Sequence, residues 1–63
     1  MRVEVGQKVL FRDVLNKHRI GTVILEKYDD ARMLFYYRIK VGTEERTQTY
    51  YGITQNQIQE VLT

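Results

Sequence analysis

The sequence of 63 residues contains no cysteine, no serine and no tryptophan, and it has a single histidine. Without cysteine there can be no disulfide, and one histidine cannot supply the ligands of a structural zinc site, so we expect no bound metal. Serine and cysteine are the commonest catalytic nucleophiles, and a glycine-rich phosphate loop is also missing. We therefore expect a protein that is not an enzyme and that carries no cofactor.

The chain is expected to form one domain over residues 1–63 with a thin stability margin, because so small a domain buries only about 60% of the surface of its unfolded chain. Hydrophobic residues make up 43% of the sequence, which predicts a packed core. No apolar run approaches the roughly 18 residues of a membrane span, and the first residues lack the features of a secretory signal, so a cytoplasmic location is predicted. A net charge of +2 permits a polyanionic partner.

Residues 33–41 contain no Gly, Pro, Asn or Asp and are rich in aromatic and β-branched side chains. This composition predicts the central strand of a small sheet. Successive side chains of a strand point to opposite faces. The core face is expected to carry Met33, Phe35, Tyr37, Ile39 and Val41. The outer face is expected to carry Leu34, Tyr36, Arg38 and Lys40.

Alternating apolar and polar residues from Val3 to Phe11 predict a first strand, interrupted by a turn at Gly6 and Gln7. No period is sustained over residues 13–19, which predicts a loop; a short helix over residues 13–17 is the alternative. Residues 20–28 predict a second strand with Gly21, Val23 and Leu25 on one face. A glycine inside a strand is typical of a bulge or a sharp bend.

Residues 42–45 have turn chemistry and predict a hairpin that returns as a fourth strand over residues 46–51, which Gly52 ends. Thr54 is suited to cap a single helical turn over residues 55–57, and residues 58–62 are expected to form a short closing strand. The acidic pairs Asp29-Asp30 and Glu44-Glu45 fall in predicted turns, so we assign them to turn formation rather than to acid/base chemistry.

This order of elements resembles the SH3-like barrel, so the expected fold is an all-β, five-stranded SH3-like barrel with one short 3-10 turn before the last strand. Lys8-Val9 followed by Gly21-Thr22-Val23 is similar to part of the pattern of KOW/Tudor-type small barrels, although the loop between them is longer and lacks the KOW glycines. Signalling SH3 domains are a worse match, since their peptide groove relies on a tryptophan. Gln48-Thr49-Tyr50 resembles a pore segment of plasmid-type dihydrofolate reductases, which implies a tetrameric reductase that binds a nicotinamide cofactor as a distant alternative.

Two groups of residues are candidates for binding. The first joins aromatic rings and cations on the predicted outer face: Tyr36, Arg38, Lys40 and, on the neighbouring strand, Tyr50. Aromatic rings can stack on nucleobases while cations hold phosphates. The second is the densest positive cluster of the chain, in the predicted loop: Arg12, Lys17, His18 and Arg19. Ordinary cross-strand pairs and a solvated loop are the alternatives for the two groups.

The leading hypothesis is a non-catalytic module that binds nucleic acid, DNA or RNA, through these two groups. The main alternative is a protein-protein interaction or assembly subunit, and a homo-oligomer is possible within it. In that case the same aromatic residues are buried against a protein partner or a second copy, because Tyr and Arg dominate such interfaces.

Overall fold

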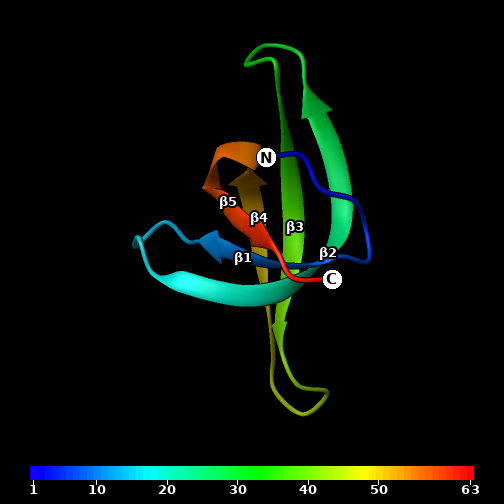
Figure 1. Ribbon diagram of the computed structural model, residues 1–63, viewed down its shortest axis with the longest axis vertical. Helices are drawn as coiled ribbons and strands as arrows, with labels where there is room; N and C mark the ends of the chain where they lie inside the picture. Colours follow the sequence, from blue (N-terminus) through cyan, green and yellow to red (C-terminus); the bar gives the residue numbers. More distant parts are fainter.

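The computed structural model describes residues 1–63 and contains one sheet of five antiparallel strands. The elements in chain order are β1 (Lys8–Arg12), β2 (His18–Asp29), β3 (Leu34–Gly42), β4 (Thr47–Thr54), the 3-10 turn η1 (Gln55–Gln57) and β5 (Ile58–Val61). The strand order across the sheet is β4-β3-β2-β1-β5 (Figure 1). The all-β class and the 3-10 turn before the last strand are therefore confirmed.

Of the expected five-stranded barrel the structure has the five antiparallel strands, but the sheet is not closed into a barrel. The two outermost strands, β4 and β5, do not pair with each other. β4 continues directly into η1, which crosses one end of the core. The chain then forms β5, which pairs with β1 at the other end of the strand order (Figure 1). The two ends of the sheet are therefore separate edges, formed by β4 and by the four-residue strand β5.

The strong curvature of the sheet comes from β2, the longest strand. Its first half pairs with β1 and its second half pairs with β3, and the ribbon bends around the core between these halves (Figure 1). Gly21 allows β2 and β3 to approach closely, since a Cβ there would lie 2.7 Å from Ile39 Cγ2 and from the carbonyl oxygen of Lys40. The bulge lies three residues later, at Ile24.

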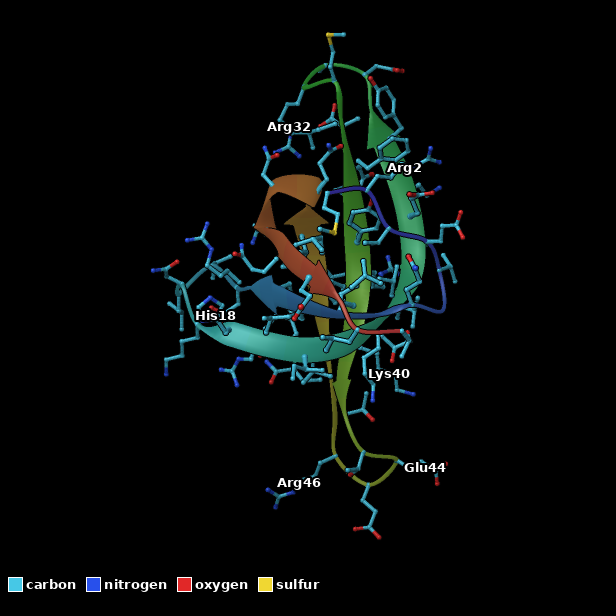
Figure 2. All side chains as sticks on the ribbon, viewed as in Figure 1. Arg2, His18, Arg32, Lys40, Glu44 and Arg46 are labelled. Atoms are coloured by element: carbon cyan, nitrogen blue, oxygen red, sulfur yellow. The ribbon has the colours of Figure 1, made fainter.

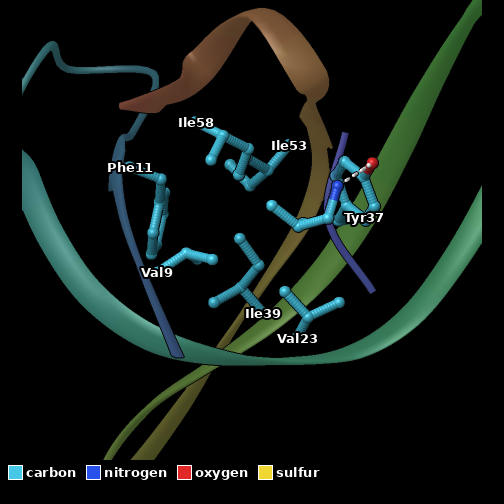
Figure 3. Close-up of a cluster of buried hydrophobic side chains, with 8 residues drawn as sticks. Val9, Phe11, Val23, Tyr37, Ile39, Ile53 and Ile58 are labelled. Atoms are coloured by element: carbon cyan, nitrogen blue, oxygen red, sulfur yellow. Dashed lines mark hydrogen bonds between the residues drawn. The ribbon is translucent and has the colours of Figure 1, made fainter. Parts of the chain in front are cut away.

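A single cluster of apolar side chains fills the concave side of the sheet (Figure 3). Its members are Val3, Val9, Phe11, Val23, Tyr37, Ile39, Ile53 and Ile58. Tyr37 and Ile39 have no exposed surface, which confirms the predicted alternation in the middle of β3. The Tyr37 hydroxyl accepts a hydrogen bond of 3.0 Å from the backbone N–H of Val3, so the N-terminal segment is tied to the core.

Several predicted boundaries are wrong. β1 begins only at Lys8, and Val3 is buried without being part of a strand, while Val5 is exposed. Met33 precedes β3: it lies in the β2–β3 turn with a φ of 55° and is 78% exposed. β4 continues past Gly52 to Thr54, because Gly52, with a φ of 66°, forms part of a bulge opposite β3 instead of ending the strand.

Candidate functional site

The outer face of the sheet carries three of the predicted binding residues together. Side chains of paired residues on antiparallel strands point to the same side of a sheet. Lys40 pairs with Thr22 of β2, and Thr22 in turn pairs with Lys8 of β1, so the two lysines belong to one outer row. Tyr36 pairs with Lys27 in a further row. Tyr36, Arg38 and Lys40 thus share the outer face, as predicted, and they are joined there by Lys8 and Lys27.

Tyr50 does not belong to this face, so its predicted place is wrong. It pairs with the buried Ile39 and points to the concave side. There its ring packs edge-on against Phe11, with 5.5 Å between ring centroids and an interplanar angle of 70°. The sequence does not define the pairing of β3 with β4, and a shift of one residue exchanges the two faces of a strand.

Tyr51 takes the outer position that was assigned to Tyr50. The Arg38 guanidinium lies over its ring, with 4.7 Å from Cζ to the ring centroid, and Tyr51 is 67% exposed. Because the bulge inserts Gly52 between them, Tyr51 points outward and Ile53 points into the core. The alternation of Thr47, Thr49 and Tyr51 is the signal that could have identified Tyr51, once Thr49 is known to pair with Lys40.

Leu25 also lies on the outer face, contrary to the prediction that it shares a face with Gly21 and Val23. The bulge at Ile24 reverses the alternation, so Val23 pairs with buried Ile39 whereas Leu25 pairs with Arg38. Side chains of these strands together form a shallow hollow of about 110 Å³. It is lined by Leu25, Tyr36, Tyr37, Arg38, Tyr51 and Gly52.

Arg38 is the only polar side chain of the hollow apart from the tyrosines. Its Nε atom is buried and has no hydrogen-bond partner. Buried donors without an acceptor are rare, since each costs about 1–3 kcal/mol and more when charged. Stacking on Tyr51 holds the guanidinium in place and leaves its hydrogen-bonding capacity largely unused. The buried Nε itself is closed to solvent, but the Arg38 side chain and the rings of Tyr36 and Tyr51 line the same hollow, so a ligand there has a cation and two aromatic rings to contact.

The charges on the outer face are of predominantly one sign. The strand registers place five cations on it: Lys8, Arg12, Lys27, Arg38 and Lys40. The acidic side chains of this face stand at its margins, Glu60 on the edge strand β5 and Asp29 at the end of β2. Asp29 is neutralised by Arg32 at 2.7 Å, and this hydrogen bond lowers the pKa of Asp29 below its ordinary value. The uncompensated field of the face is positive.

The predicted cluster of loop cations is divided by the structure. Arg12 and His18 face each other at the end of the β1–β2 hairpin, and Lys17 is exposed in the loop between them. Arg19 points to the concave side, where its Nε donates to Asp13 Oδ2 at 3.2 Å. Figure 2 shows His18 at one extremity of the molecule, well away from Lys40. The end of the β1–β2 hairpin is therefore distant from the group of Tyr36, Arg38 and Lys40, although Arg12 and His18 also occupy outer positions of the curved sheet.

Asp13 gives this loop its conformation. It is a buried carboxylate that accepts hydrogen bonds from the backbone N–H groups of Leu15 at 2.9 Å and Lys17 at 3.0 Å. The Lys17 hydrogen bond is the main reason why the pKa of Asp13 is lowered, and Arg19 contributes to the same effect. Asp13 and Arg19 together have a structural role, so Arg19 is less available to a ligand than Lys17.

A second, more open hollow of about 450 Å³ lies on the concave side, between β2 and the β3–β4 hairpin. Its polar lining consists of Arg19, Glu45, Arg46, Thr47, Gln48 and Tyr50. Gln48 and Tyr50, two residues of the segment that resembles the reductase pore, thus face this hollow while Thr49 points outward. Arg19 lies 6.0 Å from the Tyr50 ring centroid.

No group of three or more His, Cys, Asp and Glu side chains is arranged to hold a metal ion. None of the elements is a helix with the length and apolar character needed to cross a membrane. Comparison with family models, with curated proteins and with solved structures finds no match to this chain.

Proposed function

We propose that the protein is a non-catalytic, SH3-like module that binds single-stranded nucleic acid through the outer face of β2, β3 and β4. One observation carries the proposal: Arg38 is stacked on the exposed Tyr51 ring, beside Tyr36, in a hollow bordered by cations. The assignment to the SH3-like class is supported by the strand order and by the 3-10 turn before β5.

The hollow suits a nucleobase better than it suits a backbone phosphate alone. A base presents a π-face to Tyr51 or Tyr36 and hydrogen-bond acceptors to Arg38. Stacking on an aromatic side chain contributes about 1–3 kcal/mol per base and tolerates any base, because every base has a π-face. Lys27 belongs to the outer-face residue pair before Arg38 along the sheet, and Lys40 belongs to the pair after it. Both can therefore contact the phosphates that flank a base in the hollow.

A single strand is preferred in this proposal because the bases of a duplex are already stacked on one another. A base must leave its stack to enter the hollow, which costs a few kcal/mol in a duplex and little in an unpaired strand. The lining offers no carboxylate, thiol or imidazole beside Arg38, and this supports a binding role rather than a catalytic one.

The test is fluorescence anisotropy with labelled mixed-sequence DNA and RNA strands of about 12 nucleotides, a length in the range that small β modules cover. Binding is measured over a series of salt concentrations. Tyr51→Ala should weaken binding about 5- to 150-fold, the equivalent of one lost stacking contact, without changing the salt dependence. Lys40→Gln should reduce the slope of log affinity against log salt by about 0.7, the value for one phosphate contact on a single strand.

Arg46→Gln is the matched control, because it removes one positive charge from the exposed β3–β4 turn, away from the outer rows. It should leave both affinity and slope close to those of the unmodified chain. Undetectable binding at the lowest salt concentration would refute the proposal, since phosphate contacts are strongest there. An equal effect of Arg46→Gln and Lys40→Gln would show that binding does not use this face.

A further inference from the structure

The first half of β4 presents an unpaired edge whose hydrogen-bonding groups can be assigned. In the hairpin turn the Thr43 N–H donates to the Arg46 carbonyl at 2.9 Å. Bonded and non-bonded pairs alternate along an antiparallel ladder. Gln48 and Tyr50 therefore bond to β3, and the backbone N–H and C=O groups of Thr47 and Thr49 point to the free edge.

The second half of this edge is closed. Gly52 lies in the bulge, which distorts the strand, and the N–H of Thr54 donates to Gln57 Oε1 at 3.0 Å. Gln57 also donates to the Arg12 carbonyl at 2.8 Å, so η1 is held across this end of β4. The open stretch is thus limited to the residues around Thr47 and Thr49.

The open stretch has no charged residue and no proline to keep it from pairing with another strand. Natural edges are short, or they carry Lys, Pro or inward-pointing charges. The open stretch of β4 is short, but no residue of β4 is charged or a proline. The other edge strand, β5, has only four residues and carries Glu60. Of the two edges, β4 is the one able to accept another strand.

We propose that a second copy of the chain pairs antiparallel with β4 about a two-fold axis through Gln48. In this register Thr47 of each copy stands opposite Thr49 of the other, so two bonded pairs supply four backbone hydrogen bonds. The two threonines meet on the outer face, and the two Gln48 side chains meet on the concave face. Each of these side chains is both a donor and an acceptor, so the surface is complementary to itself and brings no like charges together.

The dimer joins the two sheets into one, and it makes the outer face of one copy continuous with that of the other. Lys40 pairs with Thr49 within one copy, and Thr49 then pairs with Thr47 of the second copy, so these side chains lie side by side on the joined outer face. Two hollows with their cations come to lie on one surface. A domain of this size also gains stability by burying an edge in an oligomer. The inference depends on the edge of β4 and does not require that the outer face bind nucleic acid.

The first experiment measures the oligomeric state by sedimentation velocity and native mass spectrometry over a range of concentrations. The unmodified chain and Thr49→Val, which keeps the backbone N–H, should be dimers. Thr49→Pro removes an N–H that points to the free edge, so it should leave the β3 ladder intact and give a monomer. Circular dichroism and thermal unfolding of all three proteins check that the domain still folds.

The second experiment uses the absence of cysteine in the chain. Gln48→Cys places one thiol on the proposed axis, where a non-bonded antiparallel pair separates the Cα atoms by about 4.5 Å, within disulfide range. Mild oxidation should convert it to a covalent dimer, whereas Gln59→Cys on β5 should remain largely monomeric. A monomeric unmodified chain at all concentrations, a dimer that persists in Thr49→Pro, or equal cross-linking of the two cysteine variants would each overturn the inference.

Discussion

Replacing Tyr37 with phenylalanine tests how the N-terminal segment is held to the sheet. Residues 1–7 form no strand, yet Val3 is 1% exposed and its N–H donates to the Tyr37 hydroxyl at 3.0 Å. Tyr37→Phe keeps the buried ring and removes the hydroxyl, which is the acceptor of the Val3 N–H and also interacts with the Glu26 carboxylate. The Val3 N–H is then left inside the protein without a partner.

The expected loss of stability follows from this single unpaired donor. A buried N–H that loses its acceptor costs about 1–3 kcal/mol. For a domain of this length each kcal/mol lowers the midpoint of thermal unfolding by about 4–8 °C. Urea and thermal unfolding followed by circular dichroism measure both quantities. The slope against urea should not change, because the surface exposed on unfolding stays nearly the same.

Tyr36→Phe is the matched control one residue away. Tyr36 is half-buried on the outer face, and its hydroxyl makes no hydrogen bond within the protein. Its replacement should change the free energy of unfolding by less than about 0.5 kcal/mol, as surface substitutions usually do. If Tyr37→Phe were no more damaging than Tyr36→Phe, the Val3 hydrogen bond would not hold the N-terminal segment, and the reasoning would be refuted.

The pH dependence of stability gives a second measurement on Tyr37. Burial raises the pKa of its hydroxyl above the ordinary value of 10.0; the Val3 hydrogen bond opposes this, and the Glu26 carboxylate adds to it. The neutral hydroxyl is therefore favoured in the folded state. Its contribution is complete below pH 10.0 and is lost as the pH rises through the folded-state pKa. The stability difference between the unmodified chain and Tyr37→Phe should consequently decrease at alkaline pH.

Three further substitutions test other contacts by the same unfolding assays. Gly21→Ala should cost about 1–3 kcal/mol, because the added methyl group collides with β3, and a loss below about 0.5 kcal/mol would show that β2 can move away. Asp13→Asn should make the free energy of unfolding less dependent on pH under acid conditions. The pKa of Asp13 is lowered in the folded state, so its carboxylate contributes stability above pH 3.8, and this stability is lost as the pH falls through the folded-state pKa. An unchanged pH dependence would contradict this role. Gln57→Ala removes hydrogen bonds to Thr54 and Arg12 and should cost about 1–3 kcal/mol, with Gln59→Ala as the near-neutral control.

Local chemistry in the sequence accounts for most of the secondary structure. The alternation of residues 34–41, the turn chemistry of residues 42–45 and the capping position of Thr54 each act over a few neighbouring residues. Such signals do not depend on what the rest of the chain does, and the strands, the hairpin and the 3-10 turn were predictable for that reason. The grouping of Tyr36, Arg38 and Lys40 on the outer face follows from the same alternation.

Other features depend on contacts between segments that are distant in the chain. The bulges at Ile24 and Gly52 shift the alternation by one residue, so Leu25 points outward and Ile53 points inward. The pairing of β3 with β4 decides that Tyr51, and not Tyr50, accompanies Arg38. A strand register has no signature in local composition, and a glycine inside a strand indicates a bulge without fixing its position: the bulge of β2 lies at Ile24 and not at Gly21. Position and register are selected by how well both strands fill the common core.

The amino-acid sequence by itself determined that this chain is a small all-β domain, which residues can form strands, and that cations and aromatic rings alternate with a core. Only the tertiary structure decided which of those residues meet: it separated Arg19 and Tyr50 from the outer face, left β4 as an open edge and brought Tyr51 over to Arg38. The physical reason is that side-chain periodicity is a property of one strand, whereas a binding surface is formed by the register between strands.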